Sequence, residues 1–237
     1  MNIKTQAFLF SLVMSISFVT KAQLNDQPIN LPKYDMQPIH FGFVLGVNSS
    51  TFHVNRAGDL RWRDSVYTVE AQNVTGINLG IVSNIRINDY FDFRFIPVLS
   101  FVQRNLQYTF IYADSVLTPT PKKIESSYLE FPFELKFKSK RLNNYRVYVL
   151  AGYKYSFDMI SQAKVNQQDR DLVKLNRADY GYEIGLGFDF YLTYFKFSPE
   201  IKMYNGLRNL LVGENTKFSS PLEGLYAKTF TVSLYFE

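Results

Sequence analysis

Two glutamates four residues apart are one set of side chains in this sequence that could do chemistry. Glu130 and Glu134 lie in the segment YLEFPFELKFK at residues 128–138. Paired carboxylates can share general acid and base catalysis. Lys136 lies only two residues away, however, and carboxylates among basic groups more often belong to structural ion-pair networks. The sequence therefore favours ion pairing over catalysis for these two side chains.

A hydrolytic set is the second chemical alternative. The chain contains only two histidines, His40 and His53, and serines lie close to the second one. A serine-histidine-acid set is recognised by its geometry, which a sequence does not give, so this alternative stays open. The sequence has no glycine-rich phosphate loop and no zinc-ligand spacing, so we expect no cofactor and no metal. The candidate residues of the hydrolytic set are Ser49, Ser50, His53, Asp59 and Asp64.

The segment that holds the glutamates alternates strictly between apolar and polar residues. This period of two predicts a strand with one apolar and one polar face. Its length suits a tilted strand that crosses a bilayer, which needs about 9–11 residues. A lipid-facing wall around a polar interior explains the pattern. The apolar residues are Leu129, Phe131, Phe133, Leu135 and Phe137.

Seven further segments alternate in the same way, and the connections between segments alternate in length. We therefore predict an all-β fold: a transmembrane antiparallel up-and-down β-barrel of about eight strands. Short connections at 88–90, 139–144 and 191–194 are expected to be periplasmic turns, and long ones at 49–74, 104–123, 158–177 and 205–226 external loops. Both termini then lie in the periplasm. The predicted strands are 39–48, 75–87, 90–103, 128–138, 145–157, 178–190, 195–204 and 227–237.

Two prolines interrupt these predicted strands. Pro97 and Pro132 each remove a hydrogen-bond donor from the ladder. We expect a local bulge or strained pairing at both positions.

The predicted inner face is rich in charge. Charged groups in a tight interior must pair or stay hydrated. An eight-stranded barrel is only wide enough for side chains, so a paired network that fills the interior is favoured over a path for ions or solutes. The predicted interior network comprises Arg86, Asp92, Arg94, Glu130, Glu134, Lys136, Arg146, Lys154, Glu183, Asp189, Lys196, Glu200 and Lys202.

Tyrosines and phenylalanines gather toward the two ends of the predicted strands. Two separated bands of aromatic residues are typical of the girdles at membrane interfaces. The first predicted girdle comprises Tyr108, Tyr112, Tyr153, Tyr155, Tyr180, Tyr182 and Tyr204, and the second Tyr90, Phe91, Phe137, Tyr145, Tyr191 and Tyr194.

Two predicted loops are candidates for contact with partners. Arg61, Trp62 and Arg63 are of types favoured at interfaces. Leu210 and Leu211 form an apolar cluster, which predicts either a partner or burial against the barrel rim.

The N-terminus predicts export. Lys4, a short apolar run and a small-residue cleavage site before Gln23 indicate a signal peptide at 1–22, too short to be a membrane anchor. Residues 23–38 are expected to be an extended periplasmic lead-in and 39–237 the barrel domain. Without the signal peptide the net charge falls from +5 to +3, which together with export argues against nucleic-acid binding. The chain has no cysteine, so no disulfide supports the exported fold.

Several segments together resemble the PorT family, also called SprT, of the type IX secretion system in Bacteroidota. The resemblance covers most of the mature chain and implies an outer-membrane barrel needed to secrete cargo with C-terminal sorting domains. In gliding species it implies adhesin display. The family has no established catalytic residues. The matching segments are HFGFVLGVN at 40–48, GINLGIVSNIRINDYFDFRFIPVLSF at 76–101, YLEFPFELKFKSKRLNN at 128–144, YVLAGYKYSFD at 148–158, YEIGLGFDFYLTYFKFSPEIKM at 182–203 and the terminal SLYFE.

The leading hypothesis is a non-enzymatic barrel subunit of a protein-export machine in the outer membrane. The expected partners are outer-membrane lipid and other type IX secretion components, with no nucleic acid and no evident small-molecule substrate. A general porin-like barrel or passive small-solute channel is the alternative. An enzyme at the external rim is a third hypothesis, and it depends on His53.

Overall fold

Antiparallel strands make up nearly all of the regular structure. The computed structural model describes residues 28–56, 66–112, 115–116, 120–160, 173–213, 219 and 222–237. A 3-10 turn, η1 (Tyr34–Met36), precedes the first strand of the described residues. Among the residues described, no helix is both long and apolar enough to cross a membrane. The strands are β1 Ile39–Arg56, β2 Val66–Gln72, β3 Val74–Arg86, β4 Phe91–Phe95, β5 Val98–Tyr112, β6 Ser115–Val116, β7 Thr120–Lys138, β8 Tyr145–Asp158, β9 Ala178–Tyr191, β10 Lys196–Gly206 and β11 Leu222–Phe236.

The strands close into a barrel of eight staves, where a stave is one full-length strip of the wall. β2 and β3 form one interrupted stave, β4 and β5 form another, and β6 pairs only with β5. β1 pairs with β3 on one side and with β11 on the other, which closes the ring. Each stave lies next to its neighbours in sequence, and every pair is antiparallel. The predicted fold class, an antiparallel up-and-down barrel of about eight strands, is confirmed.

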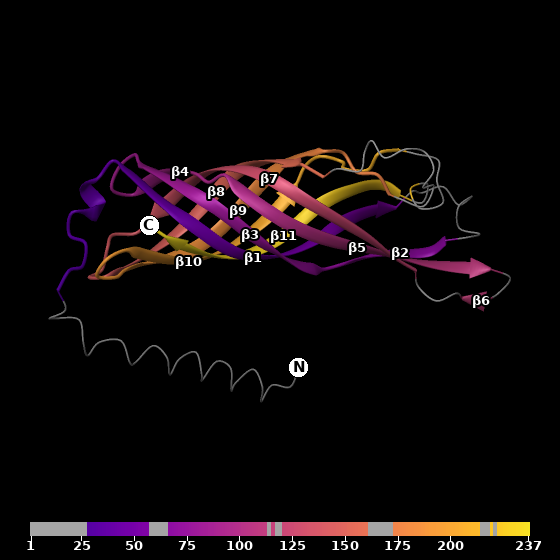
Figure 1. Ribbon diagram of the computed structural model, residues 1–237, viewed down its shortest axis with the longest axis horizontal. Helices are drawn as coiled ribbons and strands as arrows, with labels where there is room; N and C mark the ends of the chain where they lie inside the picture. The colour runs from indigo at the N-terminus through magenta and orange to yellow at the C-terminus, as the bar shows by residue number, and fades with distance from the viewer. Residues whose placement is uncertain are drawn as a thin grey trace, which may run out of the picture.

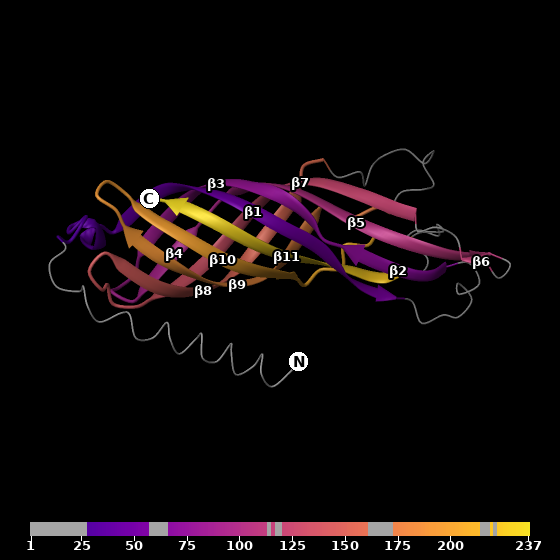
Figure 2. The same cartoon turned by 90° about the horizontal axis from the view of Figure 1, so that it is seen from below.

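The barrel has two different ends (Figure 1). The turn end carries the short connections at 87–90, 139–144 and 192–195. η1 and the C-terminus also lie there, as both views show (Figure 2). The loop end is the opposite one, where β5 and β2 extend and where β6 lies. This arrangement follows the predicted alternation of short and long connections.

Side chains alternate between the outside and the inside of the wall. Along β8, exposed and buried residues alternate from Tyr145 to Asp158. Outward Val149 is 51% exposed, whereas inward Tyr148 is 1% exposed. Large apolar residues remain exposed on nearly every stave, from Phe43 on β1 to Phe230 on β11. An outward apolar band around a polar interior is what a bilayer requires of a barrel.

At the loop end this polarity is inverted. β1, β5, β7 and β11 extend well past the predicted strand boundaries, so the predicted loops at 49–74, 104–123 and 205–226 are in part strand. Inward residues here are apolar, since Phe52, Leu106 and Leu225 are at most 4% exposed, while outward His53 is exposed. The buried residues form one apolar cluster: Phe52, Val69, Leu106, Tyr108, Val173, Leu175, Tyr204, Leu210, Leu222, Leu225 and Ala227.

β2 lies within a segment predicted to be a loop, and a bulge sets it apart from β3. Residues 73–76 on this stave oppose only residues 102–104 on β5. The extra residue flips the face of the chain, so Val69 points into the apolar cluster although odd-numbered residues of β3 point outward. Gln72 and Asn73 are both exposed, which places the bulge at Asn73.

Of the expected bulge or strained pairing at the two prolines, the described wall shows no bulge, but the strand is interrupted at Pro97, whereas β7 continues through Pro132. β4 and β5 are separated at Ile96 and Pro97, yet the register with β3 and with β7 is the same on both sides of the gap. The Ile81 amide donates to the Pro97 carbonyl at 3.1 Å, and the Ile96 amide donates to the Pro132 carbonyl at 3.3 Å. Each proline therefore costs one donor in an otherwise continuous ladder, because the neighbouring staves hold the register.

Candidate functional site: the filled barrel interior

Arg94 lies at the centre of the barrel interior and joins two carboxylates. Its side chain is 0% exposed. Nε and Nη2 donate to Glu134 Oε2 at 2.9 and 2.5 Å, and Nη2 also donates to Glu200 Oε2 at 2.6 Å. β4, β7 and β10 supply these three residues, so the cluster ties together staves that are not all adjacent.

Lys202 and two tyrosines complete this cluster. Lys202 Nζ donates to Glu134 Oε1 at 2.7 Å and lies 3.5 Å from Glu200 Oε1. The hydroxyls of Tyr148 and Tyr235 donate to the two oxygens of Glu200 at 2.7 and 2.8 Å. Buried charges are tolerated when they are paired and hydrogen-bonded, and these groups are. We call Arg94, Glu134, Glu200, Lys202, Tyr148 and Tyr235 the central cluster.

Further ion pairs fill the interior between the central cluster and the turn end. Lys136 Nζ donates to both oxygens of Asp189 at 2.9 Å and lies 3.6 Å from the centroid of the Tyr148 ring. Lys138 Nζ donates to Asp92 at 2.5 Å. Nearest the C-terminus, Lys196 pairs with the side chain of Glu237 at 3.1 Å. These pairs occupy the space that a solute path would need.

Toward the loop end, polar groups give way to the apolar cluster. Lys154 Nζ donates to Glu130 at 3.0 Å and lies 4.0 Å from the centroid of the Tyr204 ring. The Tyr204 hydroxyl donates to Asp179 at 3.0 Å. Tyr204 itself is a member of the apolar cluster, so it joins the two layers.

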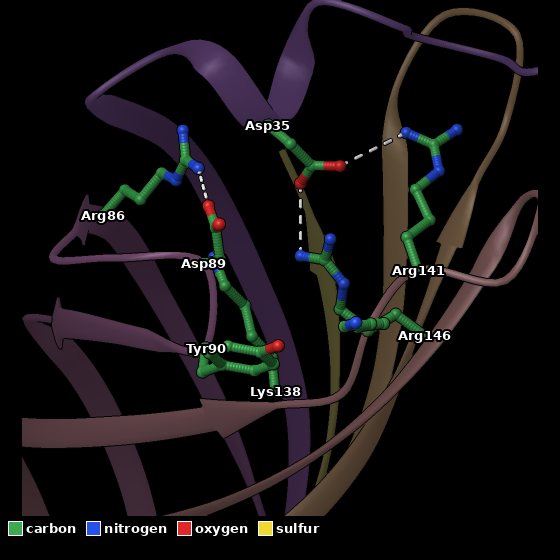
Figure 3. Close-up of a pocket in the computed structure, with 8 residues that line it drawn as sticks. Asp35, Arg86, Asp89, Tyr90, Lys138, Arg141 and Arg146 are labelled. Carbon is green, nitrogen blue, oxygen red and sulfur yellow. Dashed lines mark hydrogen bonds and ion pairs between the residues drawn. The ribbon is translucent and has the colours of Figure 1, made fainter.

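At the turn end, residues of the segment predicted as an extended lead-in fold into the barrel mouth instead. The Tyr34 ring stacks on His40 with centroids 4.0 Å apart, and its hydroxyl donates to Glu237 at 3.3 Å. Asp35 pairs with Arg146 at 3.1 Å and with Arg141 at 3.5 Å, as Figure 3 shows. The Tyr191 hydroxyl donates to Asp35 at 3.0 Å. Residues 34–36 therefore cover part of the mouth.

The electrostatics of Asp35 follow from this position. Burial by itself would raise the pKa of its carboxyl. Arg146, the hydrogen bond from Tyr191 and the charge of Arg141 outweigh that effect and hold the pKa below its ordinary value of 3.8. Asp35 is therefore ionised at neutral pH and holds η1 in the mouth.

The structure places twelve of the thirteen predicted interior charges inside the barrel, each at most 9% exposed. Arg86 differs, because β3 ends at this residue and its side chain reaches the rim, where it pairs with Asp89. Glu130 and Glu134 each bind a cation, as the ion-pair alternative predicts. Sequence reasoning missed Asp35, Glu237 and Tyr34, which lie outside or at the ends of the alternating segments and gave no periodic signal.

The predicted partner-contact residues have different outcomes. Leu210 is 0% exposed and lies in the apolar cluster, so partner contact is wrong for this residue and the alternative, burial at the rim, holds. Leu211 is partly buried against the same cluster. Arg61, Trp62 and Arg63 lie outside the described residues and stay predictions.

The predicted aromatic girdles are in part corrected. Tyr153, Tyr182 and Tyr145 are exposed on the outer face. Tyr108, Tyr204 and Tyr191 are at most 4% exposed and point inward, so their assignment to a girdle is wrong. They follow the inner face of their strands, a distinction that distance from the strand end does not reveal.

The hydrolytic set is not assembled among the described residues. Ser50 is 0% exposed and faces inward, whereas His53 is exposed on the opposite face of the same strand. Ser49 shares the face of His53 but lies four residues away, about 13 Å along a strand. Asp59 and Asp64 lie outside the described residues. The part of the chain that is described also holds no group of three histidine, aspartate or glutamate side chains that could bind a metal.

The comparison with protein families agrees with this barrel geometry. A family model described as outer membrane protein beta-barrel domain matches residues 21–212. No curated protein matches the chain. Among solved structures, OprG from Pseudomonas aeruginosa is similar at 16% identity and a TM-score of 0.45, over 84% of this chain and 90% of that one. Neisserial surface protein A is similar at 9% identity and a TM-score of 0.42, over 84% and 99%. The Yersinia pestis attachment invasion locus protein Ail is similar at 14% identity and a TM-score of 0.36, over 83% and 96%.

Proposed function

Because this chain belongs to the outer membrane protein beta-barrel domain family, we propose that it is a non-enzymatic outer-membrane component of the type IX protein secretion machinery. In this role it is required for the export of cargo with C-terminal sorting domains, and for adhesin display in gliding species. The resemblance of residues 76–101, 128–144 and 182–203 to the PorT family supports the proposal.

The filled interior is the observation that carries the choice between functions. Three layers occupy the barrel: η1 in the mouth, the ion pairs around Arg94, and the apolar cluster at the loop end. A passive solute channel needs a hydrated path, and an eight-stranded barrel has little room beyond its own side chains. The interior therefore favours a structural subunit over the alternative of a porin-like barrel or small-solute channel.

The orientation is part of the proposal. Outer-membrane barrels have short periplasmic turns and longer external loops. On that rule the turn end, with η1 and Glu237, faces the periplasm, and the apolar cluster faces the cell exterior. The predicted partners are then outer-membrane lipid around the wall and other secretion components at either end.

Affinity capture from the native envelope tests the proposal. The full chain, tagged at its C-terminus and expressed at its natural level, is captured after mild detergent extraction and analysed by mass spectrometry. We expect other type IX secretion components to co-purify. A tagged unrelated outer-membrane barrel of the same organism is the control. Equal recovery of these components with both barrels, or their absence, contradicts the proposal.

A further inference from the structure

A strongly basic pocket lies at the turn end, beside η1. Its volume is about 280 Å³, far more than the ~30 Å³ that one water occupies. Figure 3 shows Asp35 between Arg141 and Arg146, with Arg86 and Asp89 on the other side. The five basic side chains that line it are Arg86, Lys138, Lys140, Arg141 and Arg146.

The charges of this pocket do not balance. Among the described residues, Asp35 and Asp89 are the acidic residues that line it, and Asp92 pairs with Lys138. Five cations therefore face three carboxylates. The excess of two positive charges sits in a concave site, where the surrounding protein focuses the field on an anion.

Two of the cations have unused hydrogen-bonding capacity. Arg146 is 7% exposed, and its Nε has no hydrogen-bond partner in the described part of the chain. Lys140 is exposed, and its ammonium pairs with no carboxylate among the described residues. Arg146 Nε is closed to solvent and therefore to a ligand, so Lys140 is the donor that is open to an anion in the pocket.

The position of the pocket indicates where a ligand comes from. It opens at the turn end, beside Tyr90, which is 41% exposed and precedes the outward-facing Phe91. Aromatic residues of this kind lie at the depth of lipid headgroups. The site is therefore accessible both to dissolved anions and to the headgroup layer.

We propose that this pocket binds the phosphate group of an anionic ligand, carried either by a solute or by a lipid headgroup. Inorganic phosphate carries up to two negative charges, and the phosphodiester of a lipid headgroup carries one negative charge and two free acceptor oxygens, so either source supplies acceptors and negative charge to the basic pocket. Asp35 already pairs with Arg141 and Arg146, so the phosphate binds through Lys140, which has no ion pair among the described residues. This inference does not depend on a role in secretion.

Titration of the purified full-length barrel tests the proposal. Inorganic phosphate is the first probe, and its binding is monitored by phosphorus NMR in a detergent that contains no phosphorus. Sodium chloride at equal ionic strength is the reference for nonspecific charge effects. The second probe is a set of vesicles of phosphatidylglycerol or phosphatidylcholine. The barrel is extracted from these vesicles, and native mass spectrometry counts the lipids that stay bound to it. Both probes are applied to wild type, Lys140→Gln and Lys228→Gln. Lys228 is an exposed lysine of β11 near the loop end.

We expect saturable binding in wild type, about tenfold weaker binding in Lys140→Gln, and no change in Lys228→Gln. Binding of inorganic phosphate identifies the solute source, and selective retention of phosphatidylglycerol alone identifies the lipid source. Either result supports the site. Absence of saturable binding with both probes, or equal weakening by both substitutions, overturns it. Lys140→Gln removes no ion pair of the described structure, and the mobility of unheated protein on SDS gels verifies that it folds.

Discussion

Arg94 determines the charge balance at the centre of the barrel. It is fully buried and pairs with Glu134 at 2.5 Å and with Glu200 at 2.6 Å, closer than Lys202, which pairs with the same two carboxylates at 2.7 and 3.5 Å. Its Nη1 has no partner among the described residues. Removal of Arg94 therefore leaves the two buried carboxylates of the cluster with one cation, Lys202.

Replacing Arg94 is accordingly expected to be severe. We predict that Arg94→Met lowers the free energy of unfolding by roughly 3–5 kcal/mol, the usual cost of breaking a buried ion pair. Urea unfolding of the barrel in lipid vesicles measures the change. Arg86→Met is the matched control, since Arg86 pairs at the rim with an Asp89 side chain that is 76% exposed, and its loss costs below about 1 kcal/mol. Equal effects of the two substitutions would show that the central cluster adds no stability.

Asp35 makes the docking of η1 dependent on pH. Because its pKa is lower in the docked state than its ordinary value of 3.8, the ionised carboxyl stabilises docking. This contribution is complete above the ordinary value and is lost as pH falls through the lower, docked-state pKa. A spin label on Met36→Cys reports the docking, since the chain has no other cysteine and Met36 is 75% exposed.

We expect the label to stay equally restrained from pH 7 to about pH 5 and to become mobile well below pH 4. In an Asp35→Asn background the label should be more mobile at pH 7 and should lack this acid transition. The same acid transition in both proteins would mean that another group holds η1 in the mouth.

At the scale of elements, the bulge at Asn73 allows one stave to serve two environments. On the side of the bulge toward the turn end, β3 presents apolar residues to the outside. On the side toward the loop end, β2 presents Val69 to the apolar cluster. A one-residue change in register moves every side chain to the other face. The bulge is therefore the means by which this stave inverts its polarity.

Deletion of Asn73 tests this role. The deletion forces Glu70 toward the apolar cluster or breaks the pairing of β2 with β5, so we expect β2 amides to lose most of their protection from hydrogen exchange. Amides of β8 and β9 should keep theirs, because these strands lie elsewhere in the ring. Asn73→Ser keeps the chain length and serves as the control. Unchanged protection of β2 after the deletion would contradict the account.

The sequence predicted the wall well where lipid and interior differ most. Between the girdles, the alternation of large apolar and charged residues located all eight staves, as it did at 128–138. The pattern is clear there because the outer face contacts lipid and is apolar, whereas the inner face forms ion pairs and is charged. Past the girdles, water replaces lipid outside, and Phe52 and Leu106 became buried where the pattern had predicted loops. The hydrogen bond from Tyr34 to Glu237 joins the segment before β1 to the C-terminal residue, a contact between distant positions that the local alternation cannot predict.

The filled interior predicts that the barrel as a whole conducts no ions. Purified wild-type protein in a planar bilayer is expected to show no steady conductance, since charged layers and the apolar cluster occupy the interior. A known porin inserted by the same procedure is the positive control. Stable, reproducible conductance steps from wild type would favour the small-solute channel instead.

A deletion strain tests whether this barrel serves protein secretion, as we propose. The distribution of a cargo protein with a C-terminal sorting domain is measured between periplasm, cell surface and medium, with a resident periplasmic enzyme as the control for leakage. We predict that the cargo accumulates in the periplasm of the deletion strain and that a plasmid copy of the wild-type gene restores its export. Normal secretion of the cargo without this barrel would contradict the account.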